Sequence, residues 1–165
     1  MPLTPTTGIS LWEHLTNTGQ GYSYASASTN IVAAAETDFL TLTNPAGSGK
    51  TVRFWEQLLS LQINVANQSS VIRVYLNPVT VTLGVPITPS KIRPSIGAAS
   101  IVTGLFLPTV VGRGTLITTY ALGLGTFKRE LYLSRYLEVG NTLLFTVNGS
   151  GVNMPHAFSA AWAEV

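Results

Sequence analysis

Residues 44–51, NPAGSGKT, carry the pattern most suggestive of chemistry in this chain, because Gly49, Lys50 and Thr51 match the end of a phosphate-binding loop. Such a loop reads G-x-x-x-x-G-K-[ST], and its first glycine would stand where this chain has Asn44, followed by Pro45. That glycine lets the backbone N–H groups turn toward the phosphates, and proline has no N–H to offer. The start of the pattern therefore argues against a nucleotide site.

A nucleotide site also needs a carboxylate, usually at the end of an apolar strand, to help hold magnesium. The only aspartate, Asp38, precedes the loop. We interpret the later glutamates Glu130, Glu138 and Glu164 as not ending a buried run of the required kind. Residues 44–51 are thus predicted to form a polar turn between two strands. Lys50 is expected to face solvent, or a neighbouring subunit.

The other candidate catalytic and metal-binding residues are few. His14 and His156 show no ligand spacing typical of a metal site, and no G-x-S-x-G elbow accompanies them. Glu36 and Asp38 stand two residues apart, so they share one face if the segment is extended. A calcium site is the alternative there, but two solvated loop acids are the favoured interpretation. We expect no catalytic residue, no metal and no cofactor, and we predict that the chain is not an enzyme.

The composition favours a subunit of an assembly over a free enzyme. Hydrophobic residues make up 45% of the 165 residues and charged residues only 10%, against about 25% charged in ordinary soluble domains. A surface so poor in charge must be covered by small polar residues or buried against a partner. The nine basic residues are dispersed and the net charge is only +2, so we expect no nucleic-acid partner.

The lack of cysteine and the residues at the start of the chain bear on the cellular compartment that we expect for the protein. The absence of cysteine excludes disulfides and thiolate metal sites. The first ten residues lack the basic and apolar regions of a signal peptide, and no apolar run reaches the roughly 18 residues of a membrane span. We therefore expect no membrane partner. A place at a particle surface would be reached without secretion, for example by assembly with a virion.

The chain is predicted to form an N-terminal arm over residues 1–30 and one β-domain over residues 31–165. The arm is rich in Thr, Ser, Asn, Gly and Pro, with one or two helical turns in SLWEHL, where Ser10 is a plausible N-cap. We expect the arm to order along a neighbouring molecule. The candidate residues for contact with a partner or with another subunit are Trp12, Leu15, Tyr22 and Tyr24 from this arm and Lys50 from the loop.

Turn signals recur along the remaining residues as in an all-β domain of about eight strands. This pattern predicts a single β-sandwich of the jelly-roll type. Residues 51–67 fit a helical face or a strand whose parity slips once. The strand with a β-bulge is favoured because LSLQINV alternates and ends in β-branched residues. Residues 79–95 carry three prolines and are expected to form a short edge strand and a long loop.

The aromatic residues are not spaced as a base-stacking platform, so packing in the core and at interfaces is their expected role. Sugar binding on a tyrosine-bearing loop stays open.

The order of several turn-and-strand stretches resembles that of small structural proteins of tailed bacteriophages, including the head-decoration (cement) proteins with jelly-roll-like domains. These stretches are DFLTLTNPAGSGKTVRF, SSVIRVYLNPVTVTLGVPITPSKI, PTVVGRGTLI, LYLSRYLEVGNTLLFTVNG and the final WAEV. The resemblance covers roughly residues 36–165 and leaves the first 30 residues without a match. It implies a virion protein on the capsid surface, made in the host cytoplasm, with the major capsid protein and its own copies as partners, commonly as a homotrimer. A receptor- or glycan-binding jelly-roll module of a fibre or tail is the alternative.

Overall fold

A computed structural model describes residues 11–31, 35–62, 69–122, 126–130, 136–149 and 154–165. Among these residues the chain forms one helix, α1 (Leu11–Asn17), and fifteen strands, all of whose pairings are antiparallel. The predicted all-β class is confirmed, and the arrangement is consistent with a β-sandwich. The strands outnumber the eight expected because several contain only two or three residues.

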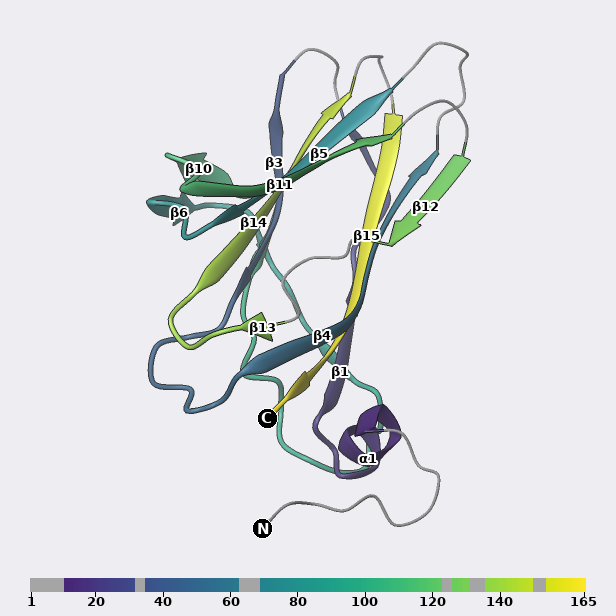
Figure 1. Cartoon of the computed structure of the whole chain (residues 1–165), viewed down its shortest axis with the longest axis vertical. Helices are drawn as coiled ribbons and strands as arrows, with labels where there is room; N and C mark the ends of the chain where they lie inside the picture. Colours follow the sequence, from purple (N-terminus) through teal and green to yellow (C-terminus); the bar gives the residue numbers. More distant parts are fainter. Residues whose placement is uncertain (1–10, 32–34, 63–68, 123–125, 131–135, 150–153) are drawn as a thin grey trace.

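The first sheet, called sheet A here, has seven strands in the order β12-β4-β15-β1-β8, with β13 paired to β4 and β2 paired to β15. Its long central pair, β4 and β15, runs the length of the molecule (Figure 1). The bounds are β1 Gly21–Ala25, β2 Thr29–Ile31, β4 Val52–Gln62, β8 Ser90–Lys91, β12 Thr126–Glu130, β13 Tyr136–Leu137 and β15 Met154–Glu164.

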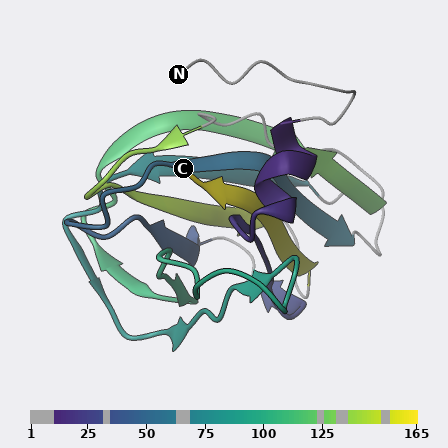
Figure 2. The ribbon, with the colours of Figure 1, turned by 90° about the horizontal axis from the view of Figure 1, so that it is seen from below.

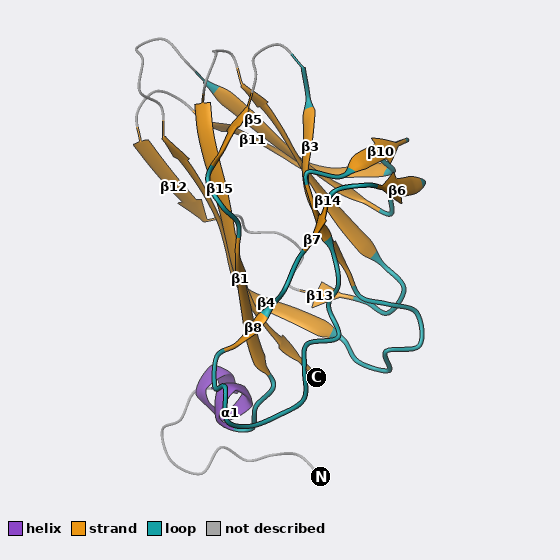
Figure 3. Ribbon diagram, turned by 180° about the vertical axis from the view of Figure 1, so that it is seen from behind, coloured by secondary structure: helices purple, strands orange, loops and turns teal. Residues whose placement is uncertain are grey.

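The second sheet, sheet B, has six strands in the order β11-β5-β14-β3-β9-β7. A separate two-stranded sheet of β6 and β10, called the ribbon here, lies beyond sheet B on the side away from sheet A (Figure 3). The bounds are β3 Thr37–Thr43, β5 Ser70–Leu76, β6 Thr80–Thr82, β7 Val85–Pro86, β9 Leu105–Phe106, β10 Thr109–Val111, β11 Thr115–Leu122 and β14 Thr142–Gly149.

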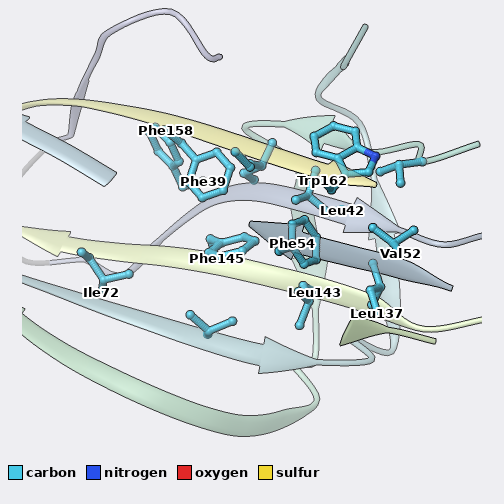
Figure 4. Close-up of a cluster of buried hydrophobic side chains, with 14 of the residues drawn as sticks. Phe39, Leu42, Val52, Phe54, Ile72, Leu137, Leu143, Phe145, Phe158 and Trp162 are labelled. Atoms are coloured by element: carbon cyan, nitrogen blue, oxygen red, sulfur yellow. The ribbon is translucent and has the colours of Figure 1, made fainter. Parts of the chain in front are cut away.

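The hydrophobic core fills the space between sheets A and B (Figure 4). Alternation places one face of each central strand inward, as the buried Ile72 and Val74 of β5 and Phe158 and Trp162 of β15 show. Phe145 and Phe158 join the two sheets with ring centroids 4.8 Å apart. Burying such side chains is the main driving force that holds the two sheets together.

The predicted bulge in residues 51–67 is confirmed for the part of this segment that the structure describes. β4 pairs with β15, but the register shifts between Ala161 and Trp162. Their partners are Glu56 and Phe54, so β4 carries one extra residue, Trp55, at this point. The rest of the segment, residues 63–67, lies outside the described residues.

The described part of the first 30 residues differs from the expected arm. α1 lies at the end of the sandwich beside the start of β1 (Figure 2). β1 pairs with β15 over Gly21–Ala25 and with β8 on its other side, so it is an interior strand of sheet A. The segment is rich in Ser and Ala and was predicted to be an arm, but Tyr22 lies in the core and the partly buried Tyr24 packs against it.

Candidate functional site

The loop that resembles a phosphate site closes on its own side chains. Asn44, which takes the place of the first glycine, is fully buried. Its Nδ2 donates hydrogen bonds to the backbone carbonyls of Lys50 at 2.8 Å and Leu137 at 2.9 Å, and its Oδ1 accepts one from Ser48 Oγ at 2.7 Å. The loop joins β3 to β4, so the predicted turn between two strands is confirmed.

Lys50 leaves this loop toward a buried carboxylate. Its Nζ lies 4.0 Å from Glu164 Oε2, with the lysine side chain 39% exposed and the glutamate side chain 0% exposed. Glu164 Oε1 accepts hydrogen bonds from Ser100 Oγ at 2.6 Å and from the Ile101 N–H at 2.9 Å. Glu164 follows the buried Trp162 at the end of β15 and is itself fully buried.

The two histidines differ in burial. His14 is exposed on α1, whereas His156 is fully buried on β15. Ser70 Oγ lies 3.0 Å from His156 Nε2, and Ser70 is buried as well, which links sheets A and B. Sequence reasoning missed Ser70, although its parity with the inward-facing Ile72 could have indicated it. A serine with no exposed surface cannot meet a substrate in this conformation, so the pair is structural.

Glu36 and Asp38 are engaged in ion pairs. The prediction that they are two solvated loop acids was wrong. Arg113 Nε donates to Asp38 Oδ1 at 2.7 Å, and Arg113 Nη1 lies 3.4 Å from Glu36 Oε2. Arg73 Nη1 lies 3.2 Å from the same Glu36 oxygen. The two acids do share one face, but arginines fill the place that a calcium ion would take. Among the described residues, no group of three or more His, Cys, Asp or Glu side chains could hold a metal ion.

Hydrogen bonds complete the surroundings of the Glu36 carboxylate. Tyr75 donates to Glu36 Oε1 at 3.0 Å, and the Thr146 hydroxyl donates to the same oxygen. Burial alone would raise the pKa of Glu36, but these hydrogen bonds and the charges of Arg113 and Arg73 together lower it. The cluster on the outer face of sheet B thus stabilises the charged form of Glu36.

The five predicted contact residues are divided by the structure. Leu15 and Tyr22 are buried within the chain's own fold; Tyr22 donates a hydrogen bond to the Ala98 carbonyl at 3.0 Å. Trp12, Tyr24 and Lys50 keep partly exposed side chains. Buried residues cannot supply contact area to a partner, so only these last three stay available.

The most exposed of the large apolar residues lie instead on the ribbon and the strand that continues it. These residues, called the ribbon residues here, are 78%, 75%, 63% and 65% exposed, in the order Val79, Leu83, Val85 and Val111. Among the described strands, β6 and β10 pair only with each other. Residues 79–90 and 96–112 contain no charged residue. Natural edge strands are commonly guarded by charge, and this ribbon is not.

The ribbon bends away from sheet B at two leucines with left-handed backbone. Leu83 has a φ of 55° and Leu107 a φ of 50°. Both lie in the same short interruption of the pairing, residues 83–84 facing residues 107–108, because Thr82 pairs with Thr109 on one side of the bend and Val85 pairs with Phe106 on the other. Left-handed backbone costs about 1–2 kcal/mol for a residue with a Cβ, so the surrounding structure holds a strained bend in place.

The base of the ribbon is fixed by the charged cluster. Arg113 follows β10 by two residues and reaches Asp38 of β3. Beside it, the Val79 N–H donates to the Gly112 carbonyl at 2.8 Å, which continues the pairing of β6 with β10. The bend and the arginine together present the apolar side chains from a rigid support.

Two hollows in the described surface complete the candidate features. One, of about 370 Å³, lies between the ribbon and the outer face of β3 and is lined by Thr41, Thr43, Val81, Pro86, Thr103, Gly104 and Leu105. The other, of about 460 Å³, lies along β1, β8 and β15 and is lined by Ser23, Tyr24, Ala25, Thr88, Ser90, Ser159, Ala160 and Ala161. Neither lining contains a charged side chain.

No protein-family model matches this chain, and no curated protein is significantly similar to it. No helix among the described residues has both the length and the apolar composition needed to cross a membrane.

Proposed function

We propose that this chain is a structural virion protein of a tailed bacteriophage, a decoration subunit that binds the outer capsid surface between capsomers and stabilises the shell. The observation that carries the proposal is the set of ribbon residues, four highly exposed apolar residues on two strands without charge. Edge strands that carry exposed apolar residues and no guarding charge are typical of an interaction site. Its partners would be the major capsid protein and other copies of the chain, as a homotrimer on the virion surface.

The strand order supports the jelly-roll-like form of the sandwich that the resemblance implies. The chain crosses repeatedly between the sheets: of the long strands, β3 lies in sheet B, β4 in sheet A, β5, β11 and β14 in sheet B, and β15 in sheet A. Within sheet B, β14 lies between β3 and β5 although it follows them by more than sixty residues. Long returns of this kind are typical of Greek-key and jelly-roll sandwiches.

The location of the chain in the virion is the test. Purified particles are disrupted and separated into heads and tails, and each fraction is probed with an antibody against the chain. We expect the chain in the head fraction. Its release from heads should lower the temperature at which they rupture. A chain found only with tails would contradict the decoration role.

A glycan- or receptor-binding module is the second candidate, and the hollow beside Tyr24 is the observation that favours it. Three serines and a threonine line this hollow together with Tyr24. A concave site with an aromatic ring and several neutral polar groups suits a sugar. Binding to a glycan array by the wild-type chain, lost in a Tyr24→Ala variant, would support this candidate over the first.

A further inference from the structure

β11 is a long edge strand without charge. It forms one edge of sheet B, where β5 is its only partner among the described strands. β11 spans Thr115–Leu122, and residues 114–127 contain no charged side chain. Leu116 and Ile117 are 50% and 41% exposed. Because alternate residues of an edge strand turn their N–H and C=O groups away from the neighbouring strand, one side of β11 offers a row of main-chain donors and acceptors.

The other edge strands in the described part of the two sheets are guarded. β12 carries three charged residues among its five, Lys128, Arg129 and Glu130. β2, β7, β8 and β13 have only two or three residues each, and β7 contains Pro86. Shortness, charge and proline are devices by which natural proteins keep an edge from pairing with another chain. β11 has none of these three, so it is the described edge best suited to accept a further strand.

We propose that β11 takes an extended, uncharged segment of the capsid protein as an added strand of sheet B. This inference deepens the proposed function and rests on it for the identity of the partner. In strand addition, main-chain hydrogen bonds supply the affinity, so the partner needs an extended backbone more than particular side chains. An uncharged segment is the match, since a charged one would find no opposite charge within residues 114–127.

Symmetry argues against a second copy of this chain as the occupant. Among the described edge strands, a copy offers only its own β11 as a long edge without charge. Two β11 strands that pair with each other are related by a two-fold axis, and such a contact closes as a dimer. The homotrimer of the proposed function has no such axis within its ring. β11 also follows the ribbon after only residues 112–114, so an added strand would continue the surface that carries the decoration role (Figure 1).

The pairing with β5 indicates where the added strand would lie. The register between β11 and β5 shifts between Leu116 and Thr118, and from Thr118 to Leu122 every residue has a partner in β5. Because a bulge bends and twists the strand locally, we expect the added strand along residues 118–122. A stretch of about five residues is a common strand length in globular proteins.

Thr119 and Ala121 lie on the outer face of sheet B within this stretch. Thr119 pairs with Arg73, which reaches Glu36 in the cluster on that face, and Ala121 is two residues further along the strand. Paired residues share a face, as do residues two apart on one strand. Both Thr119 and Ala121 are exposed. A longer side chain can therefore be placed at either position without entering the core.

Lysine substitutions at these two positions test the edge. Thr119→Lys and Ala121→Lys supply the guarding charge that β11 lacks, and each variant is titrated by co-sedimentation against heads from which the chain has been removed. We expect each to bind at least about tenfold more weakly than the wild type, which corresponds to about 1.4 kcal/mol. Ala27→Lys is the matched control, because it adds the same charge at an exposed position in the turn between β1 and β2. Thermal unfolding by circular dichroism confirms that each variant folds.

Hydrogen exchange supplies a readout that a contact through side chains alone would not change. The amide N–H groups on the free side of residues 118–122 should exchange at least about tenfold more slowly in the head-bound chain than in the free chain. Mass spectrometry of peptides from this strand measures the difference. Such protection would show that main-chain groups of β11 take part in the contact.

Three results would overturn the added strand. Lysine variants that bind as tightly as the Ala27→Lys control, or unchanged exchange over residues 118–122, would show that no strand pairs with β11. A free wild-type chain that sediments as a dimer, and as a monomer after Thr119→Lys, would show that a second copy occupies the edge. A wild-type chain that does not bind heads removes the decoration role as well, whereas a head-bound chain with unchanged exchange removes only the added strand.

Discussion

Arg113 and Asp38, 75 residues apart in the chain, meet through a hydrogen bond of 2.7 Å from Nε to Oδ1. The contact joins the end of the ribbon to β3 of sheet B. Because Arg113 also reaches the Glu36 carbonyl oxygen at 3.0 Å, one side chain binds a carboxylate and a backbone group. The direction of the ribbon therefore depends on this residue.

Arg113→Ala should lower the free energy of unfolding by about 1–2 kcal/mol, because it leaves two partly buried carboxylates with fewer partners. It should also weaken self-association, since the ribbon loses its support. Arg93→Ala is the matched control, an exposed arginine on another loop that contacts Asn17. Urea unfolding and sedimentation velocity measure the two effects. An Arg113→Ala variant that behaves like Arg93→Ala in both would contradict the supporting role.

The Glu36 cluster predicts a specific loss of stability in acid. Burial works to raise the pKa of Glu36, but the hydrogen bonds and arginines lower it below its ordinary value of 4.5. A folded-state pKa below the unfolded one contributes stability at higher pH, and this contribution is lost as the pH falls through the folded-state pKa. Unfolding free energy should therefore decline from about pH 4.5 downward.

Glu36→Gln should reduce that decline, measured by urea titrations at a series of acidic pH values, although it should be less stable than the wild type at pH 7. Glu138→Gln, at an exposed glutamate, serves as the control. Parallel acid profiles for the wild type and Glu36→Gln would contradict the assignment.

Removal of residues 1–28 should prevent stable folding, in contrast to the folding expected if they formed only an arm. The truncation deletes β1, exposes one edge of β15 and removes Tyr22 from its place beside Trp162. Large-to-small substitution of a buried aromatic residue costs about 3–5 kcal/mol, a large share of the stability of a domain this size. A chain that begins at Leu11 retains every described element and is the control. Cooperative thermal unfolding of the chain that begins at Thr29 would refute this prediction.

The sequence predicted the long central strands well, because their alternation is local. The inward Ile72 and Val74 and the bulged strand after Val52 can be recognised from a few neighbours. Tyr22 was predicted to contact a partner and not the chain's own core, because its segment has only two large residues among serines and alanines. The bend in the ribbon could not be predicted, since residues 83–84 interrupt the pairing opposite residues 107–108, more than twenty residues away.

In the candidate site, too, local features were predicted from the sequence and contacts between distant residues were not. The turn at residues 44–51 was recognisable from its missing glycine, whereas the burial of Asn44 depends on the Leu137 carbonyl from a distant strand. The ion pairs of Glu36 were likewise hidden, because Arg73 and Arg113 approach it from other strands and loops. Contacts between residues remote in sequence decide which charges are paired.

Asn44→Ala and Lys50→Ala should separate the contribution of the buried amide of the turn from that of its partly exposed lysine. Asn44→Ala removes three hydrogen bonds from a fully buried side chain and should cost about 2–3 kcal/mol of unfolding free energy. Lys50→Ala should cost less than about 1 kcal/mol, since its partly exposed ammonium lies 4.0 Å from Glu164. Neither variant should differ from the wild type in ATP calorimetry, where we expect no binding. Micromolar ATP binding that disappears with Lys50→Ala would contradict the interpretation as a turn.

Leu83→Gly should raise stability while it weakens assembly, because Leu83 combines a φ of 55° with a side chain that is 75% exposed. Glycine adopts this backbone without the cost of about 1–2 kcal/mol that a Cβ imposes. The larger entropy of glycine in the unfolded chain offsets roughly half of that gain, so a net increase of up to about 1 kcal/mol is expected.

Leu116→Gly is the control, since Leu116 is half-exposed within β11 and has no left-handed backbone. This control variant should lose stability instead. Chemical unfolding of both variants, with sedimentation of each, measures the outcome. A Leu83→Gly variant that loses as much stability as Leu116→Gly would show that the bend is not strained. A Leu83→Gly variant that still self-associates like the wild type would show that the Leu83 side chain takes no part in the contact between copies.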